Sequence, residues 1–285
     1  MSAVDESMNT PVRGVSPAGR RMGLDSAGLV GCIVAVAGWY VASAAIGPNM
    51  PMPHAVVANA IDNLVSSTKL PGIGLPRGGY LPHLLFTAYN GLLGGAIGAA
   101  AGILTGLASS ESRTLADLLA PVVTLLGTIP IVILAPFFLM WFGLSGAAQV
   151  ALVAIYTATV LHLFTFRGVS NLPPAYSDYA ATLGASPGQR FFSVRLPGSL
   201  PEIFGGLRIA FAGNWGLSAV TEMLGGRFGA GRVIVSLRAV YDLTGIMAIV
   251  LLLGLLAILA DAAILAVRAY ALRWADLSGS GSRAP

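Results

Sequence analysis

Charged residues are scarce in this sequence. Only 10% of its 285 residues are Asp, Glu, Lys or Arg, whereas 55% are hydrophobic, and the mean hydropathy is +0.79. Soluble globular domains carry about 25% charged residues, so this composition excludes an ordinary soluble domain. We therefore expect an integral membrane protein.

Residues able to support disulfide, metal or phosphate chemistry are also few. The single cysteine, Cys32, excludes a disulfide framework within the chain and a cysteine-based zinc cluster. The histidines, His54, His83 and His162, show no metal-ligand spacing. The single lysine, Lys69, lies in STKLPG, so the sequence has no P-loop, which requires Gly-Lys-Ser or Gly-Lys-Thr. If ATP drives this protein, hydrolysis must take place in another chain.

Long uncharged segments predict membrane-spanning helices, because about 20 apolar residues cross a hydrocarbon core. The turn-like segment 143–146 divides one long uncharged run into two spans. Pro121, Pro130 and Pro136 are expected to kink the first of these two. The predicted fold class is all-α, with six transmembrane helices at residues 26–46, 82–109, 118–141, 147–166, 202–223 and 244–267.

The ends of the chain are more polar than its middle. We expect a polar tail at residues 1–24, a six-helix transmembrane domain at residues 25–270 and a flexible tail at residues 271–285. Most arginines lie on the inner side if both termini are cytoplasmic, and the positive-inside tendency favours this orientation. It places the loop at residues 167–200 in the cytoplasm.

Glycine recurs every fourth residue in the second predicted span, at Gly94, Gly98, Gly102 and Gly106. One face of that helix is therefore almost without side chains. Because small residues at this spacing allow helix backbones to approach closely in membranes, we expect another helix to pack there.

Three charged residues fall within or at the ends of predicted spans, where charges are costly and are candidates for function. Arg208 either snorkels to the cytoplasmic surface or pairs with Asp261. Asp261 in turn pairs either with Arg208 or with an arginine of another helix. Glu222, near the outer end of the fifth span, either lines a gate or stabilises the fold. The candidates for lining a substrate pathway are Asn90, Asn214, Trp215, Thr221 and Glu222.

The cytoplasmic loop is predicted to contain two short helices. The first is expected at residues 174–183, with Pro173 and Pro174 at its beginning and Gly184 at its end. A stiff connector lying on the membrane surface would account for such a helix pair on physical grounds alone.

The second short helix is expected to begin at Ser186 and Pro187 and to run until Pro197. Ser199 and Glu202 then have the spacing of a capping box for the fifth span.

The loop also contains a motif of seven spaced residues: Asp178, Tyr179, Ala180, Gly184, Val194, Leu196 and Pro197. It resembles the cytoplasmic signature of ABC importer permeases, Glu-Ala-Ala-x3-Gly-x9-Ile-x-Leu-Pro. The spacing is the same, with aspartate in place of glutamate, Tyr179 in place of the first alanine and valine in place of isoleucine. The resemblance implies that these residues, together with Ala185, couple the permease to an ATPase.

A longer segment, residues 182–226, is similar to the branch of this family that handles nitrate, sulfonates, taurine and bicarbonate. Residues 128–145 and the segment around Gly229 and Gly231 support the similarity. The resemblance implies a type I ABC importer permease fold with a cytoplasmic coupling-helix loop. It implies a multi-pass protein of the bacterial cytoplasmic (inner) membrane that moves a small solute, such as one of these anions, by alternating access.

The resemblance also implies partners: ABC ATPase subunits, a second permease copy, an extracytoplasmic substrate-binding protein and membrane lipid, with no nucleic acid. A homodimer is favoured over a heterodimer. No cofactor is expected on this chain, and ATP and Mg are expected in the partner ATPase. Basic residues in the predicted outer loops would attract an anion or contact a binding protein.

Other classes of transport protein fit the sequence less well. A permease of the same superfamily for an amino acid or a vitamin precursor is the nearest alternative. An ion-coupled secondary transporter would have only Glu222 and Asp261 as coupling carboxylates within its spans. An intramembrane enzyme lacks a Ser, His and Asp arrangement or metal spacing to support it.

Overall fold

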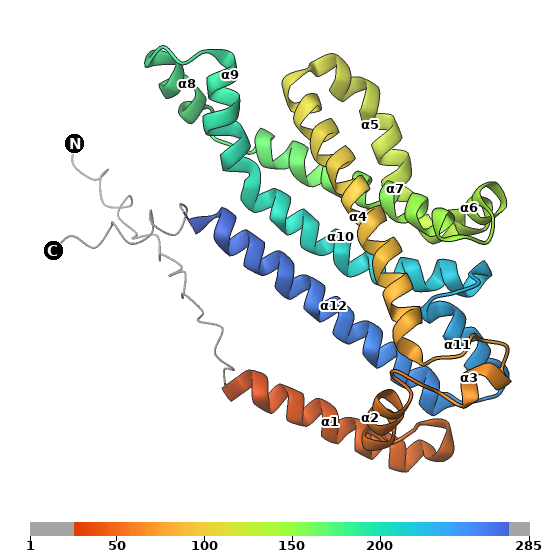
Figure 1. Ribbon diagram of the computed structural model, residues 1–285. Coiled ribbons are helices and arrows are strands. Elements are labelled where there is room, and N and C mark those ends of the chain that lie inside the picture. Colours follow the sequence, from red (N-terminus) through yellow and green to blue (C-terminus); the bar gives the residue numbers. More distant parts are fainter. Residues whose placement is uncertain (1–25, 274–285) are drawn as a thin grey trace, which may run out of the picture.

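A computed structural model describes residues 26–273 of the protein, so the tail predicted at residues 1–24 and most of the tail predicted at residues 271–285 lie outside this part (Figure 1). The described residues are helical apart from turns and one isolated bridge between Ser67 and Gly78, so the all-α fold class is confirmed. The long helices are α1 (Ser26–Ile46), α4 (Tyr80–Glu111), α5 (Arg113–Thr128), α7 (Gly146–Ser170), α10 (Leu196–Gly225) and α12 (Leu243–Ala271). The short ones are α2 (Pro53–Asp62), α3 (Lys69–Gly72), α6 (Ala135–Phe142), α8 (Pro174–Thr182), α9 (Pro187–Arg190) and α11 (Ala230–Ala239).

Four helices of the described chain are long and apolar enough to cross a membrane: α1 with the turn after it, α4, α7 and α12. A bent helix pair, α5 with α6, raises the number to five if it counts as one span. Helix α10 has 30 residues, but its glycines and polar residues such as Arg208 and Asn214 make it less apolar than these four. The structure therefore supports a multi-pass protein without confirming the predicted number of six spans.

The third predicted span, residues 118–141, is not a single kinked helix. Helix α5 ends at Thr128, and the turn Ile131–Leu134 leads into α6, so the two parts of the span lie at 90° to each other. Ile129, before Pro130, is extended, as expected for a residue that precedes proline. Pro136 lies in the first turn of α6, where its missing N–H is tolerated. Two prolines thus end and restart the helix.

The glycine face of α4 packs directly on α7, as the glycine spacing predicts. Gly94, Gly98, Gly102 and Gly106 are buried. A Cβ added at Gly94, Gly102 or Gly106 would lie 2.5 to 2.8 Å from a backbone carbonyl oxygen of α7. The α7 carbonyl groups that face these glycines are also spaced by four residues, at Val150, Ala154, Ala158 and His162. The two backbones are therefore in contact over about three helical turns.

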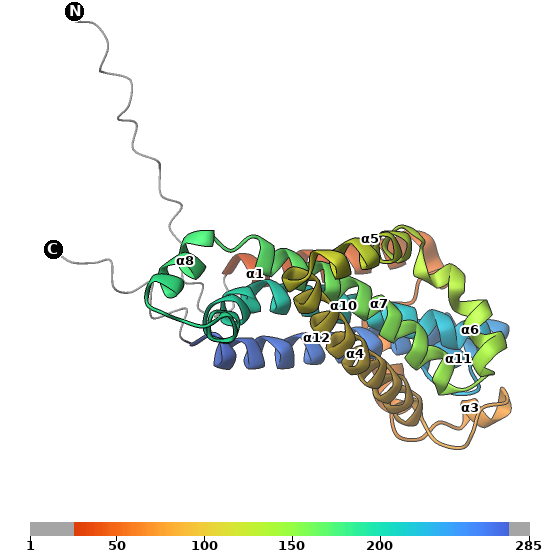
Figure 2. The same ribbon diagram turned by 90° about the horizontal axis from the view of Figure 1, so that it is seen from above.

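Helices α10, α11 and α12 complete the bundle around this pair (Figures 1 and 2). One buried apolar cluster joins α2, α4, α11 and α12 around Val56, Tyr80, Val233 and Ile249. Helix α1 stands apart from the bundle and is attached through α2 and the turn before it, where the Trp39 indole N–H donates to the carbonyl of Pro51 at 3.0 Å. Most of its described surface is exposed.

We predict that Gly102→Ala lowers the stability of the full chain in detergent by about 1–3 kcal/mol, because a Cβ there overlaps the α7 backbone. Gly254→Ala in α12 is the matched control, since a Cβ at Gly254 meets nothing within 4 Å. Thermal melts of the two variants check this. Equal melting temperatures would contradict the close packing of α4 on α7.

Candidate functional site

The candidate site residues form two groups at opposite ends of α7 and α10. The loop with α8 and α9 joins the C-terminal end of α7 to the N-terminal end of α10. A polar cavity lies where α7 begins and α10 ends. Both views show α8 far from α6 and α11 (Figures 1 and 2). Because α10 has 30 residues, the two groups are about 40 Å apart along it.

The loop contains the two short helices that the sequence predicts. Helix α8 ends at Thr182, and Gly184 adopts a positive φ of 81°, a conformation that favours glycine. At the start of α9, the Ser186 hydroxyl accepts from the Gln189 N–H and the Gln189 side chain accepts from the Ser186 N–H. This capping box makes the turn between the helices rigid.

The second loop helix does not end at Pro197, contrary to the sequence prediction. It continues through a π turn, Phe191–Arg195, directly into α10. The Ser199 hydroxyl donates to the carbonyl of Leu196 at 2.9 Å, so the predicted capping box of Ser199 with Glu202 is wrong. The helix stays continuous up to Pro197, because the Leu196 N–H bonds to the carbonyl of Phe191 across the π turn. Pro197 itself has no N–H to donate.

The predicted coupling residues are distributed along this loop. Asp178, Tyr179 and Ala180 lie on α8, Gly184 and Ala185 in the turn, Val194 in the π turn, and Leu196 and Pro197 at the start of α10. The Arg195 guanidinium donates to the carboxylate of Glu111 at the end of α4, which ties the loop to the bundle. The contact of these residues with an ATPase stays a prediction.

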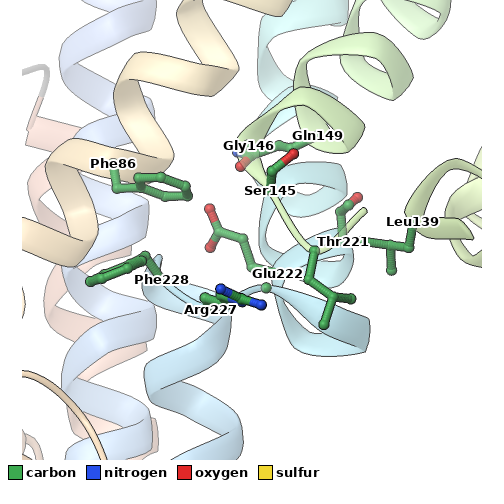
Figure 3. Close-up of a pocket in the computed structure, with 11 residues that line it drawn as sticks. Phe86, Leu139, Ser145, Gly146, Gln149, Thr221, Glu222, Arg227 and Phe228 are labelled. Carbon is green, nitrogen blue, oxygen red and sulfur yellow. The ribbon is translucent and has the colours of Figure 1, made fainter. Parts of the chain in front are cut away.

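The polar cavity has a volume of about 430 Å³. Its walls come from α4, α6, the turn before α7, the first turn of α7, the end of α10 and the loop before α11. Figure 3 shows the Glu222 carboxylate at its centre, with the rings of Phe86 and Phe228 on one side of it. The lining residues are Phe86, Leu139, Leu144, Ser145, Gly146, Gln149, Thr221, Glu222, Gly226, Arg227 and Phe228.

The Glu222 carboxylate, whose residue is only 3% exposed, connects three helices. The Thr87 hydroxyl of α4 donates to it, with oxygen distances of 2.8 and 3.0 Å. The Gly231 N–H of α11 donates to its Oε2 at 2.9 Å. The same Thr87 hydroxyl accepts from the Ala230 N–H at 2.9 Å. Two N–H groups at the start of α11, which have no partner within their helix, are thereby satisfied.

Two glycines let the carboxylate come this close to the α11 backbone. Gly229 has a φ of 104°, and a Cβ there would overlap the Glu222 carboxylate. A Cβ at Gly231 would overlap the backbone of Ala219 in α10. The Gly229 N–H also donates to the His83 ring nitrogen at 3.2 Å. The structure thus gives a steric reason for these glycines.

The fold brings only some of the predicted pathway residues to the Glu222 cavity, and Asn214 and Trp215 lie elsewhere. Thr221 lines the cavity beside Glu222, and Asn90 lies against Gly146 at its edge. The side-chain Oδ1 of Asn214 accepts from the Thr157 hydroxyl at 3.1 Å, where α7 packs against α10. Trp215 lines a different cavity, between α10 and α12. The pathway role of these residues and of Glu222 stays a prediction.

The cavity between α10 and α12, with a volume of about 720 Å³, contains the ion pair that the sequence suggested. The Arg208 Nε and Nη2 atoms donate to the two oxygens of Asp261 at 2.7 and 3.0 Å. Pairing, rather than snorkelling of Arg208 alone, is therefore confirmed. Both side chains remain partly exposed, with values of 42% and 39%.

Sequence reasoning missed Thr87, Gln149 and Arg227. Thr87 and Gln149 are uncharged residues of apolar spans, and only the packing of α4, α7 and α10 brings them to Glu222. Arg227 was predicted only as one of the basic residues of the outer loops. Its position five residues after Glu222 could have indicated that the two side chains lie close together. Among residues 26–273, no group of three His, Cys, Asp or Glu side chains is placed to hold a metal ion.

We predict that Thr87→Val destabilises the full chain by about 1–3 kcal/mol, since it takes a hydroxyl donor from a buried carboxylate and leaves the Ala230 N–H without a partner. Thr128→Val is the control, because the exposed Thr128 hydroxyl bonds only to the carbonyl of Thr124 in its own helix. Thermal melts in detergent compare the two. A Thr87→Val variant as stable as the control would show that this hydrogen-bond cluster is dispensable.

Comparison with known proteins places this architecture in a family. The protein is 29% identical over 238 residues to the formylaminopyrimidine transport permease of Halalkalibacterium halodurans, covering 83% of this chain and 90% of the relative. It is 30% identical to the taurine transport system permease of Escherichia coli (47% and 49% covered). It is 28% identical to the nitrate import permease of Synechococcus elongatus (65% and 67% covered).

A solved structure of a methionine ABC transporter in an inward-facing conformation has the same fold, with a TM-score of 0.54 at 21% identity, covering 66% of this chain and 92% of that chain. The family described as the binding-protein-dependent transport system inner membrane component matches residues 98–273. The taurine and nitrate relatives belong to the branch that the loop motif and residues 182–226 resemble. The chain is therefore a membrane transport permease of the ABC transporter class and belongs to the binding-protein-dependent transport system inner membrane component family.

Proposed function

We propose that the protein is the transmembrane permease subunit of an ATP-driven importer that moves a small anionic solute by alternating access, powered by a separate ATPase. The observation that carries the proposal is the continuous helical path from the loop to the polar cavity. Helix α9, the π turn and α10 follow one another without a break, and α10 ends at the cavity. A displacement of the loop by a partner would be transmitted along a rigid element to the other end.

The loop surface supports an ATPase as the partner. Large apolar side chains are exposed on it, namely Tyr176, Tyr179, Leu183 and Phe192. Large apolar groups exposed on one surface element are typical of protein interfaces. Asp178 and Gly184 of the signature lie among them and are exposed as well. Because the sequence has no P-loop, ATP and Mg would bind to the partner and not to this chain.

The paired charges of α10 and α12 support a second permease copy. Arg208 and Asp261 lie within two long helices and are partly exposed, whereas intramembrane charges normally face protein or a water-filled cavity. A second copy of this chain covering the face between α10 and α12 would keep the pair away from lipid. We propose a homodimer with lipid around it.

The bundle end that carries α2, α3 and α11 would face outward and receive a substrate-binding protein. The proposed orientation has six spans in the inner membrane, counting α10 and the α5–α6 pair, with both termini and the α8–α9 loop in the cytoplasm. Basic residues gather at the outward end and favour an anion: Lys69, Arg77, Arg227, Arg232 and Arg238. Nitrate, sulfonates, taurine or bicarbonate are the proposed solutes.

A vitamin precursor is the second candidate solute class. The relative with a formylaminopyrimidine substrate in its name aligns over 83% of this chain, which is a longer match than that of the taurine or nitrate relatives. Uptake assays with both solute classes would separate the two candidates.

We predict that Tyr179→Arg abolishes co-purification of a P-loop ATPase with the tagged full chain from its native membrane in mild detergent. The substitution puts a charge on a side chain of α8 that is 68% exposed. Tyr241→Arg is the matched control, because Tyr241 is 87% exposed at the other end of the bundle. It should retain the ATPase.

Mass spectrometry of the purified complexes, with gel filtration to show that both variants are folded, gives the result. If the native chain forms stable complexes without any ATPase under several extraction conditions, the importer proposal fails. Retention of the ATPase by Tyr179→Arg would instead reject the loop as the docking surface.

A further inference from the structure

Glu222 joins the last turn of α10 to three other helices through one carboxyl group. It accepts from the Thr87 hydroxyl of α4 and from the Gly231 N–H of α11. The Gln149 side chain of α7 donates to it as well. Within residues 26–273, no other side chain of α10 forms a hydrogen bond to α4 or α11. The polar connection of α10 to these two helices therefore depends on a single side chain.

Helix α11 is held to α4 and α12 without the help of α10. The N–H groups of Gly229 and Ala230 donate to His83 and Thr87 of α4. The apolar side chains of α11 belong to the buried cluster that it shares with α2, α4 and α12. Loss of the Glu222 contacts would therefore leave α4, α11 and α12 together and release α10 alone.

The proposed function requires α10 to move. Helix α9, the π turn and α10 are continuous, so a displacement of the loop reaches Glu222 along one rigid element. There α11 meets α10 at Gly231, and a Cβ at this position would overlap Ala219. No side chain of residue 231 therefore interlocks the two helices. At this end of α10, the hydrogen bonds of Glu222 are the contacts that such a displacement breaks.

We propose that Glu222 is a latch of the transport cycle: its carboxyl group holds the outward end of α10 against α4, α7 and α11, and displacement of α10 by the loop releases it. Glu222 lines the cavity of about 430 Å³ (Figure 3), so its release moves one wall of the cavity relative to the others. Glu222 is thus a positioning residue, which acts through helix contacts. The latch rests on the proposed function, because the ATPase drives the displacement.

Hydrogen exchange measured by mass spectrometry tests the latch on the full chain with its co-purified ATPase in lipid nanodiscs. The Gly231 N–H is buried and bonded to Glu222, so its exchange reports release. In the native chain, we expect ATP with vanadate to raise the exchange of peptides covering residues 226–234 at least about tenfold. Peptides covering loop residues 174–195 are the positive control for coupling to the ATPase.

Glu222→Gln keeps the size of the side chain and replaces one acceptor oxygen by an amino group. It should raise exchange of residues 226–234 without nucleotide and reduce the response to nucleotide to less than about twofold. Glu202→Gln, the same change at the exposed other end of α10, should behave like the native chain. If Glu222→Gln does not fold, Gln149→Leu removes one donor and keeps the other two. It should raise exchange without nucleotide about threefold and reduce the response to nucleotide.

Three results would overturn the latch, and they separate it from the importer proposal. A native chain whose loop responds to nucleotide while residues 226–234 do not rejects the latch alone. A variant with raised exchange but an undiminished response to nucleotide shows that Glu222 only stabilises the fold, which also rejects the latch. Absence of an ATPase, or of any response in the loop, rejects the importer proposal and the latch with it.

Discussion

The close contact between α4 and α7 sets the positions of the other helices and of the polar cavity. Four glycines at a spacing of four residues let the α4 backbone lie on the carbonyl groups of α7. Such packing gains dispersion energy without loss of side-chain entropy, because glycine has no side chain to order. This matters in lipid, where the hydrophobic effect does not drive helices together. The contact also fixes the register of the helices. Thr87 and Gln149 face each other near Glu222 only because that register holds.

The Glu222 cluster extends the same constraint to α10 and α11. One hydroxyl, that of Thr87, both donates to the carboxylate and accepts from the first N–H of α11. The atoms of α10 lie so close to Gly229 and Gly231 that neither position has room for a side chain. The short helix α11, which also packs its apolar residues into the bundle, is thereby tied to two long helices at the wall of the cavity.

At the other end of α10, rigidity comes from helical continuity. A π turn joins α9 to α10 directly before Pro197. The loop and the cavity are therefore linked by one continuous helical element. The capping box at Ser186 and the Arg195–Glu111 pair hold the loop in place. The exposed ion pair adds little energy by itself, but it restrains the loop relative to α4.

The amino-acid sequence was sufficient to predict the helical class, the membrane character, the close packing on the glycine face of α4 and the two loop helices. Each of these depends on local composition or on a repeat along one helix. It left open whether Arg208 snorkels or pairs with Asp261, and the fold brings the two together. Three features became evident only in the folded chain: Pro130 breaks the third predicted span through 90°, α9 continues into α10, and Asn214 and Trp215 lie apart from the Glu222 cavity. These features depend on how helices that are distant in sequence pack together. Local propensity allows more than one backbone conformation at these positions, and tertiary packing determines which of them forms.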